Sequence, residues 1–399
     1  MGITFTSDEI TIVDGDYTFE DIYQASQDQG NDYCQKLGYS YLISIDVILG
    51  DESTLTTLTG ENISVTIEGD LFQVTKNSEL RLGTKDDNGA TANGVYLSCP
   101  NIKNAYGFGS KHVVDGTTQS GNIFLYDSFL DIYGFWAFFG GTEQKCEIID
   151  CLVNGYGRVE GKDSILENIT TQKSNGRYGI LAAKGSISSY KNITSKKSED
   201  YKDHTCSVYF NPAYSPNMRV TGGVFDGYIE GLIYAEKNDT GVTEAGYITF
   251  IDSEIRNGFG GYYSDENTKL FISYTFNPKF KDASNNTLSD VQVTIVNNED
   301  EEVFSGTSDE NGEISTELIS HIEDSSDSVT YSYFDVTAEK DDIKVTRRYY
   351  AGVTYKDFPF FVTEGGGSSD DECCLDDIQT KLDNLQDYLE AKLENKGFI

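Results

Sequence analysis

Carboxylates are the most abundant side chains in this chain that could do chemistry. The 399 residues include 66 Asp or Glu against 30 Lys or Arg, which gives a formal net charge of -36. Two groups fall in neighbouring predicted turns: Asp150, Glu160, Asp163 and Glu167, and then Asp226, Glu230 and Glu236. Two carboxylates about 5 to 9 Å apart can act as acid and base in glycoside hydrolysis. Such groupings also arise by chance in so acidic a chain, so the sequence leaves enzymatic activity undecided and favours a protein that is not an enzyme.

Residues that bind metals or nucleotides do not occur here in recognisable motifs. His112, His204 and His321 are far apart, and His204 with Cys206 makes half a zinc site at best. There is no nucleophile elbow, P-loop or dinucleotide fingerprint. The acidic stretch 86–89 lacks calcium-loop spacing and predicts a type I′ hairpin instead. We therefore expect no metal ion and no cofactor.

Aromatic residues are the stronger candidates for binding a ligand. Phe135, Trp136 and Phe138 lie in the densest aromatic run, and Tyr262 and Tyr263 form a second. Aromatic faces beside polar acceptors suit sugar rings, whereas the alternative is that these rings stack inside the core. Because side chains alternate along a strand, we expect a mixture of the two.

Charge and cysteine usage limit the partners and the compartment. A strongly acidic chain repels nucleic acid and anionic membrane surfaces. The sequence begins without a signal-peptide pattern and has no apolar run of the roughly 18 residues that span a bilayer, so we expect no membrane insertion. Seven cysteines form no disulfide framework. Five of them are expected to be buried reduced thiols: Cys34, Cys99, Cys146, Cys151 and Cys206.

The elements that must position these residues are short strands. An apolar unit recurs, spaced by 17 to 31 residues, with anchors at Phe129, Leu152, Ile169, Ile193, Val224 and Ile255. One turn of three short strands cannot bury its inward side chains alone, but turns stacked about 4.8 Å apart can. The repeat predicts a right-handed parallel β-helix over 41–274, with a β-sandwich array and a β-propeller as alternatives. The Asn-Ile-Thr repeated at Asn168 and Asn192 predicts an inward polar ladder.

Composition changes at both ends of this region. Residues 1–40 predict an N-terminal cap whose helix begins with a capping box of Thr18 and Asp21. Residues 275–363 predict a small antiparallel β-sandwich. The segments 288–291, 306–307 and 309–312 resemble the transthyretin-like or carboxypeptidase-regulatory-like family of immunoglobulin-type modules, over about 80 residues. The resemblance implies a role in spacing or adhesion.

The C-terminal residues predict self-association. Residues 364–372 form a Gly- and Ser-rich linker, and 373–399 a short coiled-coil helix. Its apolar seam consists of Leu375, Ile378, Leu382, Leu385 and Leu389. Three heptads are marginal as an isolated helix, so the seam implies a second copy of the chain. Cys373 and Cys374 at its start are either exposed thiols or an interchain disulfide collar.

Taken together, these features resemble the fibres and tailspikes of viruses that infect bacteria or archaea. In that group a β-helix trimer is joined to small β-domains and a short coiled coil. The resemblance implies a homotrimeric appendage on the virion surface that contacts other virion proteins and binds a host-surface carbohydrate or receptor. The alternatives are a tailspike enzyme that cleaves host polysaccharide and a cell-surface adhesin.

Overall fold

The computed structural model consists mostly of β-strands. It describes residues 2–57, 62–75, 77–102, 107–112, 118–119, 121–132, 137–139, 144–154, 157–160, 164–172, 178–184, 187–195, 206–210, 217–226, 231–235, 246–256, 260–263, 268–282, 284–351 and 359–362. Within these residues there is one α-helix, so the predicted all-β class is confirmed. The chain divides into two compact units, the first comprising 1–275, 317–333 and 350–354, and the second 276–316, 334–349 and 355–399.

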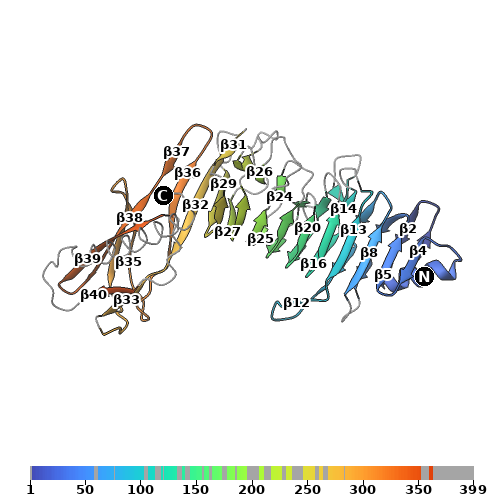
Figure 1. Ribbon diagram of the computed structural model, residues 1–399, viewed down its shortest axis with the longest axis horizontal. Coiled ribbons are helices and arrows are strands. Elements are labelled where there is room, and N and C mark those ends of the chain that lie inside the picture. Colours follow the sequence, from blue (N-terminus) through green and yellow to red (C-terminus); the bar gives the residue numbers. More distant parts are fainter. Residues whose placement is uncertain are drawn as a thin grey trace, which may run out of the picture. The chain divides into compact units, whose positions relative to one another are not determined.

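Parallel strands of the first unit line up in three ladders. Figure 1 shows their arrows following one another along the unit. Ladder A contains β2 (Glu9–Ile12), β6 (Asp46–Leu49), β9 (Phe72–Val74), β14 (Phe108–His112), β18 (Ala137–Phe139), β21 (Gly157–Glu160), β24 (Tyr178–Lys184), β26 (Cys206–Phe210), β28 (Gly231–Ala235) and β31 (Gly261–Tyr263). Ladder B contains β3 (Gly15–Thr18), β7 (Ser53–Thr56), β10 (Glu79–Leu82), β16 (Asn122–Tyr126), β19 (Cys146–Ile149), β22 (Ser164–Glu167), the first part of β25 (Ile187–Ser195) and of β27 (Asn217–Asp226), β29 (Gly246–Ile251) and β32 (Thr268–Phe276). Ladder C contains β5 (Ser40–Ile43), β8 (Ile63–Ile67), β13 (Val95–Cys99), β17 (Phe129–Ile132), β20 (Leu152–Asn154), β23 (Thr170–Gln172), the later parts of β25 and β27, and β30 (Glu254–Arg256).

Register places similar buried side chains one above another, because paired residues on neighbouring strands point the same way. One run of ladder B consists of Leu82, Leu125, Ile148, Leu166 and Tyr190, and a second of Val220, Phe250 and Ile272. Ladder C contributes Val65, Leu97, Leu130, Val153, Thr171, Ser195 and Phe225. The resulting apolar core continues through the first unit from strand to strand.

A left-handed residue marks the corner between ladders B and C. The corner residues are Asp127, Asp150, Asn168, Asn192 and Asp252, with φ from 47° to 56°. Asn168 donates from Nδ2 to Asp150 Oδ1 at 2.7 Å, and Asn192 donates from Nδ2 to Asn168 Oδ1 at 2.9 Å. The predicted polar ladder is therefore present, but its predicted inward direction is wrong, since Asn168 and Asn192 are exposed. The left-handed turn directs them outward, and the next residue, such as Ile169 or Ile193, is buried.

This corner explains a shift in the predicted repeat. The residues that pair across ladder C are Phe129, Leu152, Thr170, Thr194, Val224 and Glu254. The anchors Phe129, Leu152 and Val224 are among them, whereas Ile169, Ile193 and Ile255 lie one residue away. Ile169 and Ile193 were chosen as anchors because they are apolar, and they are the inward residues directly after the corner. The residues at the equivalent ladder position are the next ones along the chain, and a shift of one residue exchanges the two faces of a strand.

Replacing the corner residue Asn168 by valine is expected to destabilise the first unit by about 2 kcal/mol. A β-branched residue at φ 54° is strained by about 1 to 2 kcal/mol, and the two amide hydrogen bonds are also lost. Asn168→Gly is the matched control, because it loses the same hydrogen bonds and tolerates the conformation. Urea unfolding midpoints compare the two variants; equal midpoints would show that the backbone conformation does not limit the corner.

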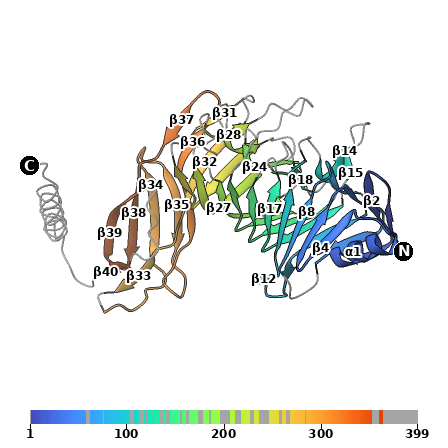
Figure 2. The ribbon, with the colours of Figure 1, turned by 45° about the vertical axis from the view of Figure 1, so that its right-hand side comes forward.

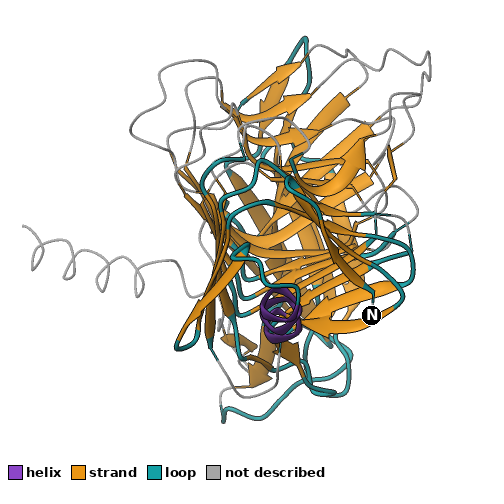
Figure 3. Cartoon of the chain, turned by 90° about the vertical axis from the view of Figure 1, so that its right-hand side faces the viewer, coloured by secondary structure: helices purple, strands orange, loops and turns teal. Residues whose placement is uncertain are grey.

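Helix α1 (Phe19–Asp28) follows β3, and its capping box is formed as predicted. Asp21 N donates to Thr18 Oγ1, and Thr18 N donates to Asp21 Oδ2. Phe19, Ile22 and Ala25 are buried in the core. Figures 2 and 3 show α1 among the N-terminal strands, where β1 (Ile3–Phe5) pairs with β2 and β4 (Cys34–Leu37) pairs with β5, both antiparallel. A further short strand, β15 (Thr118–Gln119), pairs with β14 of ladder A and is antiparallel to it.

A hairpin of β11 (Thr84–Lys85) and β12 (Thr91–Ala92) is inserted between β10 and β13. The hairpin was predicted, but the type I′ turn is wrong: Gly89 has φ 87°, whereas Asn88 does not have positive φ. Asp86 instead closes the loop by accepting from the amides of Asn88 and Ala90 through Oδ1.

The second unit contains an antiparallel sheet in the order β35 (Glu302–Thr307), β34 (Gln292–Asn297), β38 (Tyr333–Lys340) and β39 (Ile343–Tyr350). A short parallel pair joins β33 (Lys279–Asp282) to β40 (Pro359–Val362). Of the segments that carry the resemblance to immunoglobulin-type modules, 288–291 contacts Ser308, which lies between the other two, since Val291 N donates to Ser308 Oγ at 3.0 Å. The hairpin of β36 (Thr316–Glu323) and β37 (Ser328–Thr330) belongs to the first unit, although the sequence groups these residues with the later strands. The predicted linker and coiled coil lie outside the described residues.

Candidate functional site

The aromatic residues predicted to bind a ligand fall on ladder A where they are described. Phe138 lies in β18, and Tyr262 and Tyr263 lie in β31; their side chains, and all of Phe135 and Trp136, are outside the described part. One register position joins Phe138, Arg158, Leu181, Tyr209, Tyr234 and Tyr262 on successive strands. At about 4.8 Å per strand, Phe138 and Tyr262 are about 24 Å apart. The two predicted aromatic groups therefore share a ladder position but do not form one site.

The carboxylates considered for catalysis are bound by neighbouring side chains where the structure describes them. Asp150 accepts from Asn168 and from Thr91 Oγ1, and Glu167 lies 3.4 Å from Lys191 Nζ. Glu160 and Asp226 are described only in their backbone, and Asp163, Glu230 and Glu236 lie outside the described residues. Asp150 and Glu167 thus have structural roles in the ladders.

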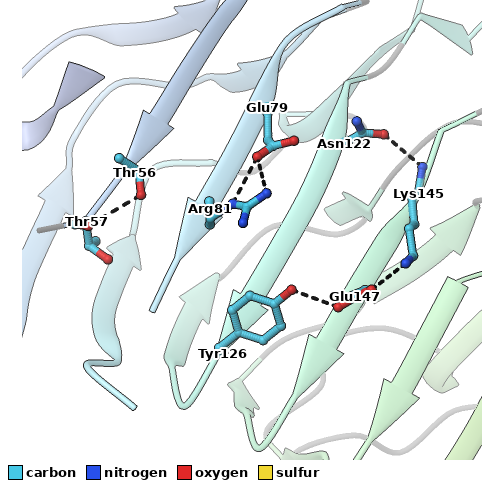
Figure 4. Close-up of polar contacts among 8 residues, drawn as sticks. All are labelled: Thr56, Thr57, Glu79, Arg81, Asn122, Tyr126, Lys145 and Glu147. Carbon is cyan, nitrogen blue, oxygen red and sulfur yellow. Dashed lines mark hydrogen bonds and ion pairs between the residues drawn. The ribbon is translucent and has the colours of Figure 1, made fainter. Parts of the chain in front are cut away.

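A buried carboxylate that the sequence did not single out is Glu147 of β19, which is 5% exposed. Figure 4 shows its contacts with Lys145 and Tyr126. Lys145 Nζ and Lys85 Nζ lie 2.5 and 2.9 Å from its two oxygens, and Tyr126 Oη donates to it at 2.7 Å. Burial alone would raise the pKa of Glu147, but the hydrogen bonds from Lys145, Lys85 and Tyr126 lower it to about 2. The carboxylate is therefore an anchor that stays ionised, which is unlike a general acid.

The hairpin of β11 and β12 reaches this anchor across an intervening strand. Lys85 bonds to Glu147 of β19, past β16, and its ammonium lies 5.6 Å from the centre of the Tyr126 ring. Thr91 bonds to Asp150 beyond the end of β19. Tyr126 and Ile149, which pair on the outward side of ladder B, are buried. The hairpin fastens three successive strands of the ladder together.

A groove lies on the outward side of the first unit, over β27, β29, β32 and β36. Its volume is about 310 Å³. The residues that give it chemical character are Asn217, Arg219, Tyr247, Thr249, Phe271 and Glu317. Arg219, Thr249 and Phe271 occupy one register position on three adjacent strands, so alternation along the strands puts them on the same face. Glu317 reaches the groove from β36.

Aromatic and charged groups meet in this groove. The rings of Tyr247 and Phe271 are 5.7 Å apart at an interplanar angle of 46°, and Tyr247 is 38% exposed. Arg219 forms an ion pair with Glu317, whose other oxygen accepts from Ser273 Oγ at 2.7 Å. Two donors thus hold the carboxylate, while the ring of Tyr247 offers an exposed aromatic surface. Such a combination suits a ligand with one apolar face and a polar edge.

Sequence reasoning missed this groove for a specific reason. Phe271 and Tyr247 could be found as outward residues of alternating strands, but Glu317 is 98 residues from Arg219 in sequence. The sequence also assigned residue 317 to a different domain. The groove contains aromatic rings other than those that the sequence singled out, Tyr247 and Phe271.

Other kinds of site are not apparent where side chains are described. Four predicted thiols, Cys34, Cys99, Cys146 and Cys151, are free and buried as expected; burial raises the pKa of Cys34 to about 12, so it is a poor nucleophile. Cys206 lies in β26, with its side chain outside the described part. The described residues contain no cluster of three or more metal-ligating side chains. No helix among them is long and apolar enough to cross a bilayer.

Comparison of the chain with protein-family models, with curated proteins and with solved structures finds no match. The interpretation of the chain therefore depends on its own ladders and groove.

Proposed function

We propose that the three ladders are the faces of a right-handed parallel β-helix, and that the chain is a structural appendage, a fibre or spike, of a virus particle. The regular succession of parallel strands with a continuous apolar core supports the β-helix. Within each ladder a strand contacts the strands above and below it. This stacking favours a stiff support. A small β-sandwich and a C-terminal coiled coil complete this proposal.

Homotrimerisation through the C-terminal seam is part of the same proposal. The seam from Leu375 to Leu389 needs a partner helix to bury its apolar face. In this arrangement the appendage contacts other virion proteins at one end and a host surface elsewhere. Its high negative charge disfavours nucleic acid as a partner.

The appendage binds a host-surface carbohydrate or receptor without cleaving it. The observation that carries this step is the outward groove, with the exposed Tyr247 and the half-buried Phe271 beside the Arg219–Glu317 pair. The resemblance to viral fibres in sequence organisation adds the expectation of a virion surface location. The described carboxylates Asp150 and Glu167 are engaged in structural bonds, which favours binding over catalysis.

Sedimentation equilibrium of the full chain tests the trimer, with an expected mass three times that of one chain. Leu382→Asp, on the seam, is expected to dissociate it, whereas Asn384→Asp, off the seam, is expected to leave it intact. The trimer should coat host cells, detected by a fluorescent label. A monomeric wild-type chain would contradict the oligomeric proposal, and a trimer that coats no host cell would contradict the binding role.

An assay for reducing ends released from host polysaccharide separates the appendage from a tailspike enzyme. We expect no release. Release that is abolished by Asp150→Asn or Glu167→Gln would instead support cleavage by those carboxylates. Neighbouring genes distinguish a virion protein from a cell-surface adhesin, because capsid, portal and tail genes would exclude the adhesin.

A further inference from the structure

The groove over β27, β29, β32 and β36 has features that define a ligand class more narrowly than a host glycan. We propose that it binds one electrically neutral sugar ring of the hexopyranose type. This inference rests on the proposed function and deepens it, since it names the recognising residues and the charge of the ligand.

Size and aromatic geometry indicate a single ring. The volume of about 310 Å³ lies at the small end of the range of about 300 to 1000 Å³ for small-molecule sites. Tyr247 and Phe271 lie side by side on adjacent strands, with Tyr247 open to solvent. The C–H face of a pyranose ring is apolar and can stack on an aromatic face.

The polar wall of the groove matches the hydroxyl edge of such a ring. A guanidinium has five N–H donors and a carboxylate about four acceptor positions. Arg219 and Glu317 use one nitrogen and one oxygen in their pairing, and Ser273 holds the second oxygen of Glu317. Neighbouring sugar hydroxyls can therefore accept from Arg219 and donate to Glu317. Asn217 and Thr249 add further polar groups.

Charge balance in the groove selects a neutral ligand. The charges of Arg219 and Glu317 cancel, and the remaining lining residues are uncharged. An anionic sugar bound to the free donors of Arg219 would place a second negative charge beside the Glu317 carboxylate, and like charges repel each other. The formal charge of -36 on the chain opposes an anionic ligand as well.

Saturation-transfer NMR on the full chain tests this inference. The probes are the methyl α-pyranosides of glucose, galactose and mannose, with N-acetylneuraminic acid as the anionic comparison. We expect transfer to the ring protons of at least one neutral probe. Tyr247→Ala and Arg219→Gln should each weaken its binding about tenfold, which corresponds to about 1.4 kcal/mol.

Tyr96→Ala is the matched control, because Tyr96 is also 38% exposed and also packs on one aromatic ring, that of Phe129. It should leave binding unchanged, and circular dichroism verifies that each variant is folded. Transfer to N-acetylneuraminic acid alone, transfer to no probe, or binding unaffected by either groove variant would overturn the inference. If one of these NMR results is obtained but wild-type protein still coats host cells, the sugar-ring inference fails and the proposed function survives. If wild-type protein coats no host cells, the proposed function fails whatever the NMR result.

Discussion

Replacing Phe250 by alanine is expected to reduce the free energy of unfolding of the first unit by about 3 to 5 kcal/mol. Phe250 is fully buried, pairs with Val220 and Ile272 in ladder B, and meets the ring of Phe225 edge-on at 5.0 Å. Removing the ring leaves a cavity that the neighbouring strands cannot fill, because their backbones are fixed by the ladder hydrogen bonds. Urea unfolding followed by circular dichroism measures the loss.

Phe271→Ala is the control for this prediction, since Phe271 is on the next strand but on the outward side and only half-buried. We expect it to cost less than about 1.5 kcal/mol. Because stacked strands contact only their neighbours, Phe250→Ala should also accelerate amide hydrogen exchange most in β27, β29 and β32. Equal losses in the two variants would show that the inward and outward faces of ladder B are assigned incorrectly.

Glu147→Gln is expected to destabilise the first unit by about 2 kcal/mol at neutral pH, since hydrogen bonds to a charged group contribute about 1.5 to 3 kcal/mol. The variant keeps an acceptor for Tyr126 but loses the charge that pairs with Lys85 and Lys145. The pKa of Glu147 in the folded chain, about 2, lies below its usual value of 4.5. Its contribution is therefore complete above about pH 5 and is lost as the pH falls towards 2.

Unfolding midpoints of wild type and Glu147→Gln, measured from pH 7 to pH 2, test the sign of this effect. The difference between the two should be largest at neutral pH and shrink at acid pH. Glu254→Gln is a suitable comparison, because Glu254 pairs with Arg256 on an exposed surface and should have little effect. A difference that grows on acidification would contradict the buried ion-pair account.

Local sequence signals predicted the elements better than their register. Strands broken by Asn, Asp and Gly identified the all-β class, and the Thr18–Asp21 pair identified the start of α1, because these signals act within a few residues. The corner residues were harder to interpret. Asn168 and Asn192 have the chemistry of a buried amide ladder, yet the left-handed backbone directs them outward, a conformation that the sequence alone does not specify.

Contacts between distant segments could not be predicted from the sequence. Lys85 gives no indication that it will meet Glu147, and Arg219 none that it will meet Glu317, since both pairings depend on which strands become neighbours. The aromatic candidates show the same limit. Phe138 and Tyr262 were selected by composition, but the ladder separates them by five strand spacings.

The hairpin of β11 and β12 has a consequence for synthesis of the chain. Lys85 lies 62 residues before Glu147, so it leaves the ribosome well before the carboxylate that will hold it. During that interval Tyr126 emerges without its final cover, and a nascent chain stopped before β19 would expose it. The pairing of Tyr126 with Ile149 and the contact of Lys85 with Glu147 can therefore form only after β19 has been synthesised.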